Sequence, residues 1–206
     1  MKYLITGGGG NLARQLARLL LADGDQIVLF DIANKPADIE CEYVQGDLTD
    51  INKVAAVLDQ HQPDMLLHMA SLLSGKCEQD RELGWQVNVT ACFTLFEAVL
   101  NSSVKTIFFP SSLAAFGGTL PDPLPEDHAQ WPEGIYGVTK ATCERLGNYY
   151  HKVHGLDFRC LRLPMVISRF PLSCCHSRKT RVSASRQGPP GDGRAASPLS
   201  TLCAQA

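Results

Sequence analysis

Residues 1–13 read MKYLITGGGGNLA, an apolar run that leads into four glycines and the first residues of a helical pattern. The apolar run Lys2–Thr6 predicts a buried β-strand. Glycines let the backbone turn tightly, and a helix that begins at the turn presents free N–H groups and the positive end of its dipole. A strand, a glycine-rich turn and a helix in this order predict a site for the pyrophosphate of a dinucleotide. A turn with only a structural role is the alternative.

The second predicted strand, Gln26–Asp31, ends in a carboxylate that suits the same dinucleotide. Asp31 lies 21 residues after Gly10, where a carboxylate can accept hydrogen bonds from the adenosine ribose hydroxyls. An acid there would repel a 2′-phosphate, so the expected cofactor is NAD rather than NADP. A solvent-exposed aspartate at a strand end is the alternative. The predicted cofactor contacts in the turn are Gly7, Gly8, Gly9, Gly10, Asn11 and Leu12.

Short apolar runs alternate with longer helical patterns from residue 2 to about residue 168. The predicted strands are Lys2–Thr6, Gln26–Asp31, Glu42–Gln45, Met65–Met69, Thr106–Pro110 and Phe158–Leu163. The predicted helices are Leu12–Ala22, Ile51–His61, Leu83–Asn101 and Tyr136–His154. This alternation predicts a parallel sheet with helices on both faces, which is the doubly wound, Rossmann-type α/β fold.

Two further segments follow predicted strands and suit cofactor contacts. Asp47 and Leu48, in GDLTD after the third strand, suit a contact with the adenine amino group. An N-cap for the following helix is the alternative for Asp47. The sequence HMAS closes the fourth strand, and its small residues let the chain pass close to the ribose and nicotinamide. Met69 and Ala70 are therefore predicted cofactor residues.

Tyr136 and Lys140 lie four residues apart and so share one face of a predicted helix. A free tyrosine has a pKa of about 10, and a nearby lysine and an oxidised nicotinamide would both lower this pKa. Lys140 can also hold the nicotinamide ribose. Ser112 ends the fifth strand, where it can hydrogen-bond the substrate oxygen whose proton Tyr136 takes. A chance Tyr-x-x-x-Lys pattern is the alternative.

The segments TGGGGNLA, HMAS, SSLAAFG and YGVTK, in this order, resemble the extended short-chain dehydrogenases/reductases of the NAD-dependent epimerase/dehydratase type. The resemblance covers residues 1 to about 168. It implies Tyr136 as the proton acceptor with Lys140 and Ser112 as its catalytic partners. It also implies Asn88 near the cofactor, although backbone groups could instead satisfy this asparagine. The NAD contacts it implies are Gly7 through Leu12, Asp31, Asp47 and Leu48.

Two branches of the family are most similar. IYGVTK, GLDFRCLRLP and MVIS resemble short-chain-type L-threonine 3-dehydrogenases, a likeness that places Val166 beside the nicotinamide. In that branch a tyrosine stands at the position of Leu163. LLSGKCEQD and LGWQVN are closer to D-erythronate dehydrogenases, with Ser71 and Ser74 facing the substrate. Both likenesses imply oxidation of a secondary alcohol in a small hydroxy acid or hydroxy amino acid. Nucleotide-sugar epimerases and dehydratases remain the rival branch.

The composition is that of a globular chain. Hydrophobic residues make up 45% and charged residues 19% of the 206 positions, and the net charge of −2 gives no reason to expect nucleic acid as a partner. The eight cysteines show no metal-ligand spacing, so we expect buried, reduced thiols and no metal site. We find no signal peptide and no apolar run long enough for a membrane span. The sequence predicts a cytoplasmic protein with a small-molecule substrate.

The composition changes after Ser168. Residues 169–206 are basic and rich in proline, glycine and serine, which is typical of disordered tails. Out-of-frame translation and a natural basic tail are two interpretations. The family would continue here into a substrate-binding lobe, so a truncated NAD-binding module without turnover is a further hypothesis. The family also implies a homodimer through Leu83–Asn101 and Tyr136–His154, although these helices could simply cover the sheet.

Overall fold

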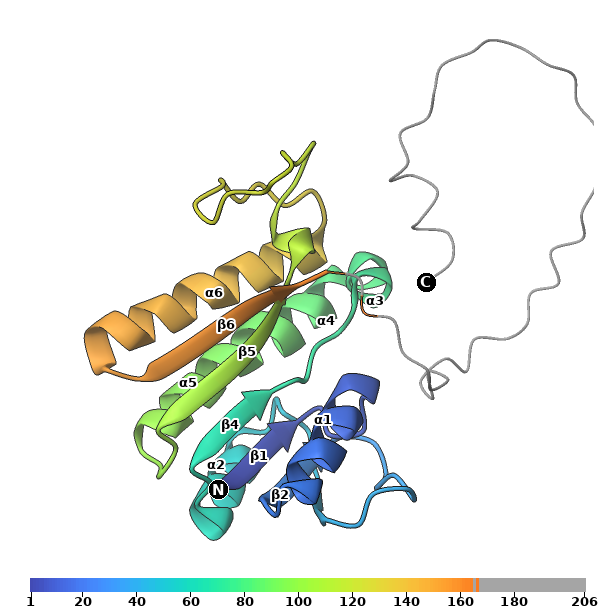
Figure 1. Ribbon diagram of the computed structural model, residues 1–206, viewed down its shortest axis with the longest axis vertical. Coiled ribbons are helices and arrows are strands. Elements are labelled where there is room, and N and C mark those ends of the chain that lie inside the picture. The colour runs from blue at the N-terminus through green and yellow to red at the C-terminus, as the bar shows by residue number, and fades with distance from the viewer. Residues whose placement is uncertain (165, 167–206) are drawn as a thin grey trace, which may run out of the picture. The chain divides into compact units, whose positions relative to one another are not determined.

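The computed structural model describes residues 1–164 and 166, and its centre is a parallel β-sheet (Figure 1). The strands lie in the order β3-β2-β1-β4-β5-β6, so the chain starts in the middle of the sheet and builds outward in both directions. This is the order of a doubly wound, Rossmann-type fold, as predicted. The strands are β1 (Lys2–Thr6), β2 (Gln26–Asp31), β3 (Glu42–Gln45), β4 (Met65–His68), β5 (Thr106–Ser112) and β6 (Asp157–Leu163).

Helices cover both faces of the sheet, and each face has its own apolar core. α1 (Asn11–Ala22) packs through Ala13 and Ala17 on one face, against Ile5 and Leu29. The other face carries a larger core with the remaining long helices, of which α5 and α6 lie behind β5 and β6 in Figure 1. The other helical segments are α2 (Ile51–His61), α3 (Ser74–Gln79), α4 (Arg81–Trp85), η1 (Gln86–Thr90), α5 (Ala91–Leu100), η2 (Leu113–Ala115) and α6 (Ile135–His154).

The strand register brings the predicted site segments to one edge of the sheet. Thr6, the last residue of β1, is paired with His68, the last residue of β4. The glycine turn and the HMAS segment therefore leave the sheet side by side. Ser112 is paired with Leu163 at the same carboxyl edge, which is where open α/β sheets bind their ligands.

Most predicted elements are confirmed, several with bounds shifted by one residue and two with larger differences. β5 continues past Pro110 to Ser112, although proline donates no ladder hydrogen bond. The strand can continue through Pro110 because its pairing with β4 has already ended at Phe108. Beyond that residue β5 continues to pair with β6, as far as Ser112. The predicted helix Leu83–Asn101 is interrupted by a π-helical turn, η1, between α4 and α5. The short segments α3 and η2 were not predicted.

The run Arg81–Leu100 has a mean hydropathy of 1.2 and would be long enough, by length and composition only, to cross a membrane. Almost half of it is buried within the protein, where α5 packs against α2 and α6. A core helix of this kind needs the same apolar composition. The absence of a membrane partner and the predicted homodimer both stay predictions.

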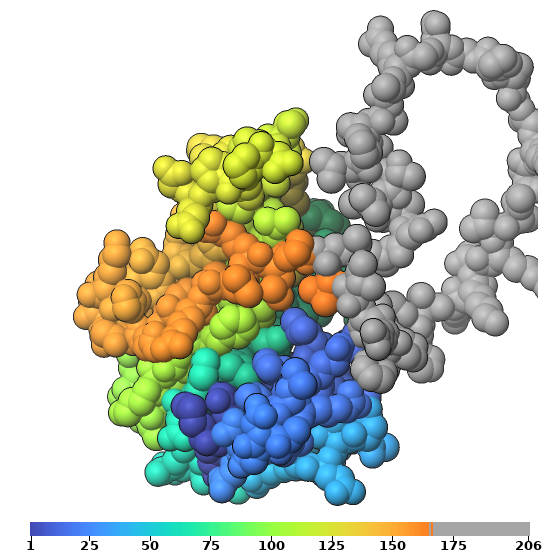
Figure 2. All heavy atoms as spheres, viewed as in Figure 1, coloured from blue at the N-terminus to red at the C-terminus, as the bar shows by residue number. Residues whose placement is uncertain are grey.

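β6 is one of the two outer strands of the described sheet, and its central residues Arg159, Cys160 and Leu161 are exposed. It belongs to the orange surface in Figure 2. Cys160 therefore differs from the predicted buried thiols, whereas Cys77, Cys92 and Cys143 are buried. The second predicted region, residues 169–206, lies outside the described residues.

Candidate active site

The glycine turn after β1 is built so tightly that only glycine fits at its first position. Gly7 has a φ of +68°, in the left-handed region, and a Cβ placed on it would lie 2.6 Å from the backbone nitrogen of Ala70. The Gly10 N–H closes the turn with a 2.9 Å hydrogen bond to the Gly7 carbonyl oxygen. Gly8 packs equally closely on Leu29 of β2. We call this turn, residues Gly7–Gly10, the glycine cradle.

The cradle opens onto the first turn of α1. Gly10 is the N-cap residue, and no side chain caps the described helix there. The side chain of Asn11 is turned toward Gln15, whose amide donates to its Oδ1 over 3.2 Å, and Leu12 is partly exposed. Free N–H groups and the positive end of a helix dipole are what a pyrophosphate requires. The residues present therefore fit a dinucleotide.

Asp31 lies beside this cradle at the end of β2. Its Oδ2 accepts a 2.9 Å hydrogen bond from the Gly9 N–H, and its Oδ1 accepts one of 2.9 Å from the Ala33 N–H. The carboxylate is half-buried, so it retains an open side. Asp31, the residue predicted to bind the ribose, therefore lies directly against the turn predicted to bind the pyrophosphate.

Asp47 and Leu48 follow β3 and play different structural parts. Asp47 is exposed and accepts a 2.9 Å hydrogen bond from the Thr49 N–H. The helix cap considered for Asp47 is instead Asp50, which accepts from the Lys53 N–H. The Leu48 side chain is buried in the larger core. Only its backbone is thus free to serve the predicted adenine contact.

A buried pair ties the turn to β4. His68 Nδ1 lies 2.8 Å from Thr6 Oγ1, and this hydroxyl accepts a 3.4 Å hydrogen bond from the Ala70 N–H. Complete burial, together with the Lys140 charge, lowers the pKa of His68 to about 3, so the ring stays neutral. Met69 donates its N–H to the Thr6 carbonyl oxygen over 3.1 Å. This pair was not recognised in the sequence, although HMAS contains the histidine.

Tyr136, in the first turn of α6, meets two serines from the strand ends. Burial raises the pKa of Tyr136, while hydrogen bonds with Ser112 and Ser71 act in the opposite direction. The pKa of Tyr136 in this structure is thus raised, and Lys140 is not among the groups that shift it, which differs from the lowering predicted from the sequence. The three hydroxyls belong to α6, to the end of β5 and to the segment after β4, so they gather at one point of the carboxyl edge. The role of Ser71 as a partner of the phenol was not predicted.

Lys140 lies one turn along α6 and is almost fully buried. Its Nζ donates a 2.9 Å hydrogen bond to the Pro110 carbonyl oxygen and lies 5.6 Å from the centre of the Tyr136 ring. The same nitrogen lies 4.6 Å from the Phe109 ring centre, a distance typical of cation–π contacts. Burial lowers the pKa of Lys140, and neighbouring cysteines act against this.

Gly137 allows the start of α6 to approach η2, the turn directly after β5, closely enough for these contacts. A Cβ on Gly137 would lie 2.0 Å from the Ala114 carbonyl oxygen. Any side chain would push the helix start away from η2 and separate Tyr136 from Ser112. The glycine in YGVTK is therefore required by packing.

Asn88 lies behind the site, inside the π-helical turn η1. Its Oδ1 accepts a 2.7 Å hydrogen bond from the Leu72 N–H, and its Nδ2 donates to the Leu72 carbonyl oxygen over 3.0 Å. Nδ2 also lies 3.2 Å from Thr139 Oγ1 on α6. The asparagine thus clamps the segment after Ser71 to the helix that carries Tyr136. The hydrogen-bonding groups of Asn88 are thus satisfied by the Leu72 backbone, which was the alternative considered for this residue. Its predicted role near the cofactor stays a prediction.

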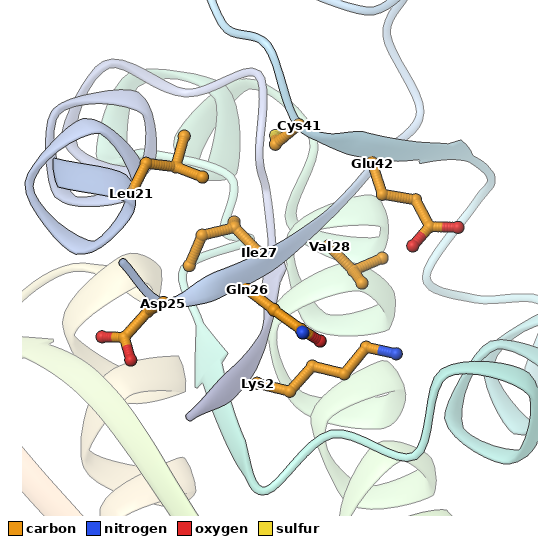
Figure 3. Close-up of a pocket in the computed structure, with 8 residues that line it drawn as sticks. All are labelled: Lys2, Leu21, Asp25, Gln26, Ile27, Val28, Cys41 and Glu42. Atoms are coloured by element: carbon orange, nitrogen blue, oxygen red, sulfur yellow. The ribbon is translucent and has the colours of Figure 1, made fainter. Parts of the chain in front are cut away.

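Val166 follows β6 and is 53% exposed, and its predicted place beside the nicotinamide stays a prediction. A hollow of about 340 Å³ lies at the opposite, amino edge of the sheet, where Lys2, Gln26 and Glu42 begin their strands (Figure 3). It contains none of the predicted site residues.

The fold and this cluster define a Rossmann-type α/β protein whose sheet edge combines a glycine cradle with a partly buried tyrosine and a buried lysine. The model of the NAD dependent epimerase/dehydratase family matches residues 3–185. The chain belongs to this family, as the resemblance predicted, and the family name agrees with the predicted cofactor.

Named relatives agree with the two predicted branches. The chain is 35% identical over 172 residues to the mitochondrial L-threonine 3-dehydrogenase of Sus scrofa, covering 81% of this chain and 46% of that protein. It is 34% identical over 176 residues to the D-erythronate dehydrogenase of Haemophilus influenzae, covering 82% and 56%. The chain thus spans about half the length of these relatives.

Among solved structures, the holo form of the GalE-like L-threonine dehydrogenase from Cupriavidus necator superposes with a TM-score of 0.79 at 28% identity. The match covers 83% of this chain and 58% of that one.

Proposed function

We propose that this chain is an NAD-dependent oxidoreductase that oxidises a secondary alcohol of a small hydroxy acid or hydroxy amino acid. The observation that carries the proposal is the meeting of Tyr136, Ser112 and Lys140 at the same sheet edge as the glycine cradle. The fit of Gly7 and Asp31 to a dinucleotide supports the cofactor.

Each residue has a distinct part in the proposed reaction. Ser112 orients the substrate hydroxyl, and Tyr136 removes the proton from that hydroxyl. Lys140, buried beside the phenol, supplies a positive charge that favours phenolate during this transfer. Bound oxidised NAD would supply the acceptor for the hydride. The Gly7–Gly10 cradle and the α1 N-terminus would hold its pyrophosphate.

The substrate class rests on the relatives, because an L-threonine dehydrogenase and a D-erythronate dehydrogenase match at similar identity. The test is NADH formation by the full chain with L-threonine and with D-erythronate. Turnover on one of the two supports the proposal and chooses the branch.

Nucleotide-sugar epimerisation is a second candidate, favoured by the family description itself. Interconversion of UDP-sugars, without turnover of either small acid, would support it. A third outcome is NAD binding without any turnover, which would support a non-catalytic binding module. This outcome is considered because the chain spans about half the length of its relatives.

We expect Asp31→Asn to weaken NAD binding about 10-fold and to narrow the preference for NAD over NADP. The amide keeps an acceptor for the Gly9 N–H, but a charged acceptor for the ribose is lost, and such hydrogen bonds contribute about 1.5–3 kcal/mol. Calorimetric titration with both cofactors measures the effect. Asp59→Asn, an exposed carboxylate of α2, is the control, and an equal effect of both changes would contradict the role of Asp31.

A further inference from the structure

A buried carboxylate on the catalytic helix lies outside the functions assigned so far. Glu144 follows Tyr136 and Lys140 at intervals of four residues on α6, so the three side chains share one face of the helix. Only 10% of its side chain is exposed. A buried carboxylate is costly unless it is well hydrogen-bonded.

Glu144 gathers hydrogen-bond donors from three other segments. The Ser111 hydroxyl, one residue before Ser112 in β5, donates to Oε1. Gln130, in the loop before α6, donates to Oε2 over 2.8 Å. Arg162 of β6 donates from Nη2 to Oε2 over 2.7 Å and from Nε to Oε1 over 3.0 Å. One carboxylate thus joins β5, β6 and the preceding loop to α6.

The ion pair between Arg162 and Glu144 is packed against an aromatic ring next to η2. The Arg162 guanidinium lies 4.8 Å from the centre of the Phe116 ring, and Phe116 follows η2 directly. Burial alone would raise the pKa of Glu144, but the hydrogen bonds from Arg162, Ser111 and Gln130 outweigh burial and lower this pKa. The carboxylate is therefore held ionised, and charge-assisted bonds of this kind are short and directional.

The two neighbouring serines of β5 have different hydrogen-bond partners on α6. Ser111 points to the face covered by α6 and contacts Glu144, whereas Ser112 reaches the Tyr136 phenol. Because the two serines are adjacent on one strand, holding Ser111 against α6 also limits the movement of Ser112 relative to Tyr136. A displacement of about 1 Å at such a site can lower a rate 100-fold.

We propose that Glu144 is a positioning residue for the proposed reaction: its carboxylate holds the end of β5 and the loop before α6 against the catalytic helix, and so sets Ser112 relative to Tyr136. The proposal rests on the proposed function only for its kinetic consequence. The positioning of the phenol can be measured without turnover.

The test compares Glu144→Gln and Ser111→Ala with Glu82→Gln, an exposed carboxylate of α4. In the full chain with ¹³C-labelled tyrosine, the Tyr136 resonance is titrated with pH. Glu144→Gln and Ser111→Ala are both expected to raise the Tyr136 pKa by about half a unit or more, because a hydrogen bond from Ser112 favours the phenolate. Glu82→Gln should leave the titration unchanged.

If the unchanged chain oxidises an alcohol, kcat should fall about 10-fold or more in Glu144→Gln and in Ser111→Ala. The KM for NAD should stay within about twofold of its value in the unchanged chain. The double variant should be no worse than Glu144→Gln alone, because both changes break one network. Simple loss of stability would not separate kcat from KM in this way.

A folded Glu144→Gln variant whose Tyr136 titrates as in the unchanged chain would overturn the proposal. If this variant does not fold, because it leaves Arg162 unpaired, Ser111→Ala decides by the same criterion. If the unchanged chain oxidises no alcohol but the titration shifts as expected, the proposed function fails while the positioning role of Glu144 stands.

Discussion

Tyr136→Phe is expected to lower kcat about 1,000-fold while NAD still binds. Removal of a positioned general base costs about 10²–10⁴-fold, and phenylalanine keeps the ring that packs near Lys140. The measurement is NADH formation on the substrate that the unchanged chain oxidises, with NAD affinity determined by calorimetry on the same preparation.

Tyr149→Phe is the matched control, because this tyrosine lies on the same helix and is half-exposed. Its kcat should stay within about twofold of the unchanged chain. Comparable losses in both variants, or full activity of Tyr136→Phe, would remove Tyr136 from the reaction.

The pH dependence of the unchanged chain follows from the same residue. Burial raises the pKa of Tyr136, so the neutral phenol is favoured at neutral pH and the base form increases as pH rises. We therefore expect kcat/KM to increase with pH on the alkaline side. A flat profile across this range would contradict a tyrosine base.

Gly7→Ala should have the second largest effect, on both cofactor affinity and stability. The added Cβ would collide with the Ala70 nitrogen at 2.6 Å, and a φ of +68° strains any residue with a side chain. We expect the free energy of unfolding to fall by about 1–3 kcal/mol. We expect the Kd for NAD to rise at least about 10-fold, the effect of losing one hydrogen bond to a charged group.

Gly24→Ala separates strain from collision. Gly24 also has a positive φ, of +83°, but an added Cβ there meets no atom within 4 Å. This variant should lose some stability and keep its NAD affinity. If Gly24→Ala weakened NAD binding as much as Gly7→Ala does, the cradle would lose its support.

The elements that could be predicted are those whose pattern is local. Lys2–Thr6 and Gln26–Asp31 are apolar runs bounded by glycine or polar residues, so their period and length are enough to define them. The glycine turn and the Tyr136–Lys140 spacing are equally local. This is why the Rossmann-type fold and the cradle could be predicted from the residues.

The remainder depends on contacts between distant segments. Glu144 could not be linked to Ser111 or Arg162 because only the folded chain brings α6, β5 and β6 together. The π-helical turn η1 has no residue pattern that distinguishes it from an α-helix. It contains Asn88, whose hydrogen bonds to Leu72 join segments that are distant in the sequence. The sign of the Tyr136 pKa shift likewise follows from burial, which spacing along the helix does not reveal.

The most direct test of the account is the pKa of Tyr136 measured in the absence of nucleotide, with bound NAD and with bound NADH. The full chain carries five tyrosines, and ¹³C labelling with Tyr136→Phe as reference assigns the resonance. We predict a lower pKa with NAD than with NADH, because only the oxidised nicotinamide carries a positive charge beside the phenol. Binding of both nucleotides with one unchanged titration curve, or no binding of either, would contradict a shared site for the cradle and this tyrosine.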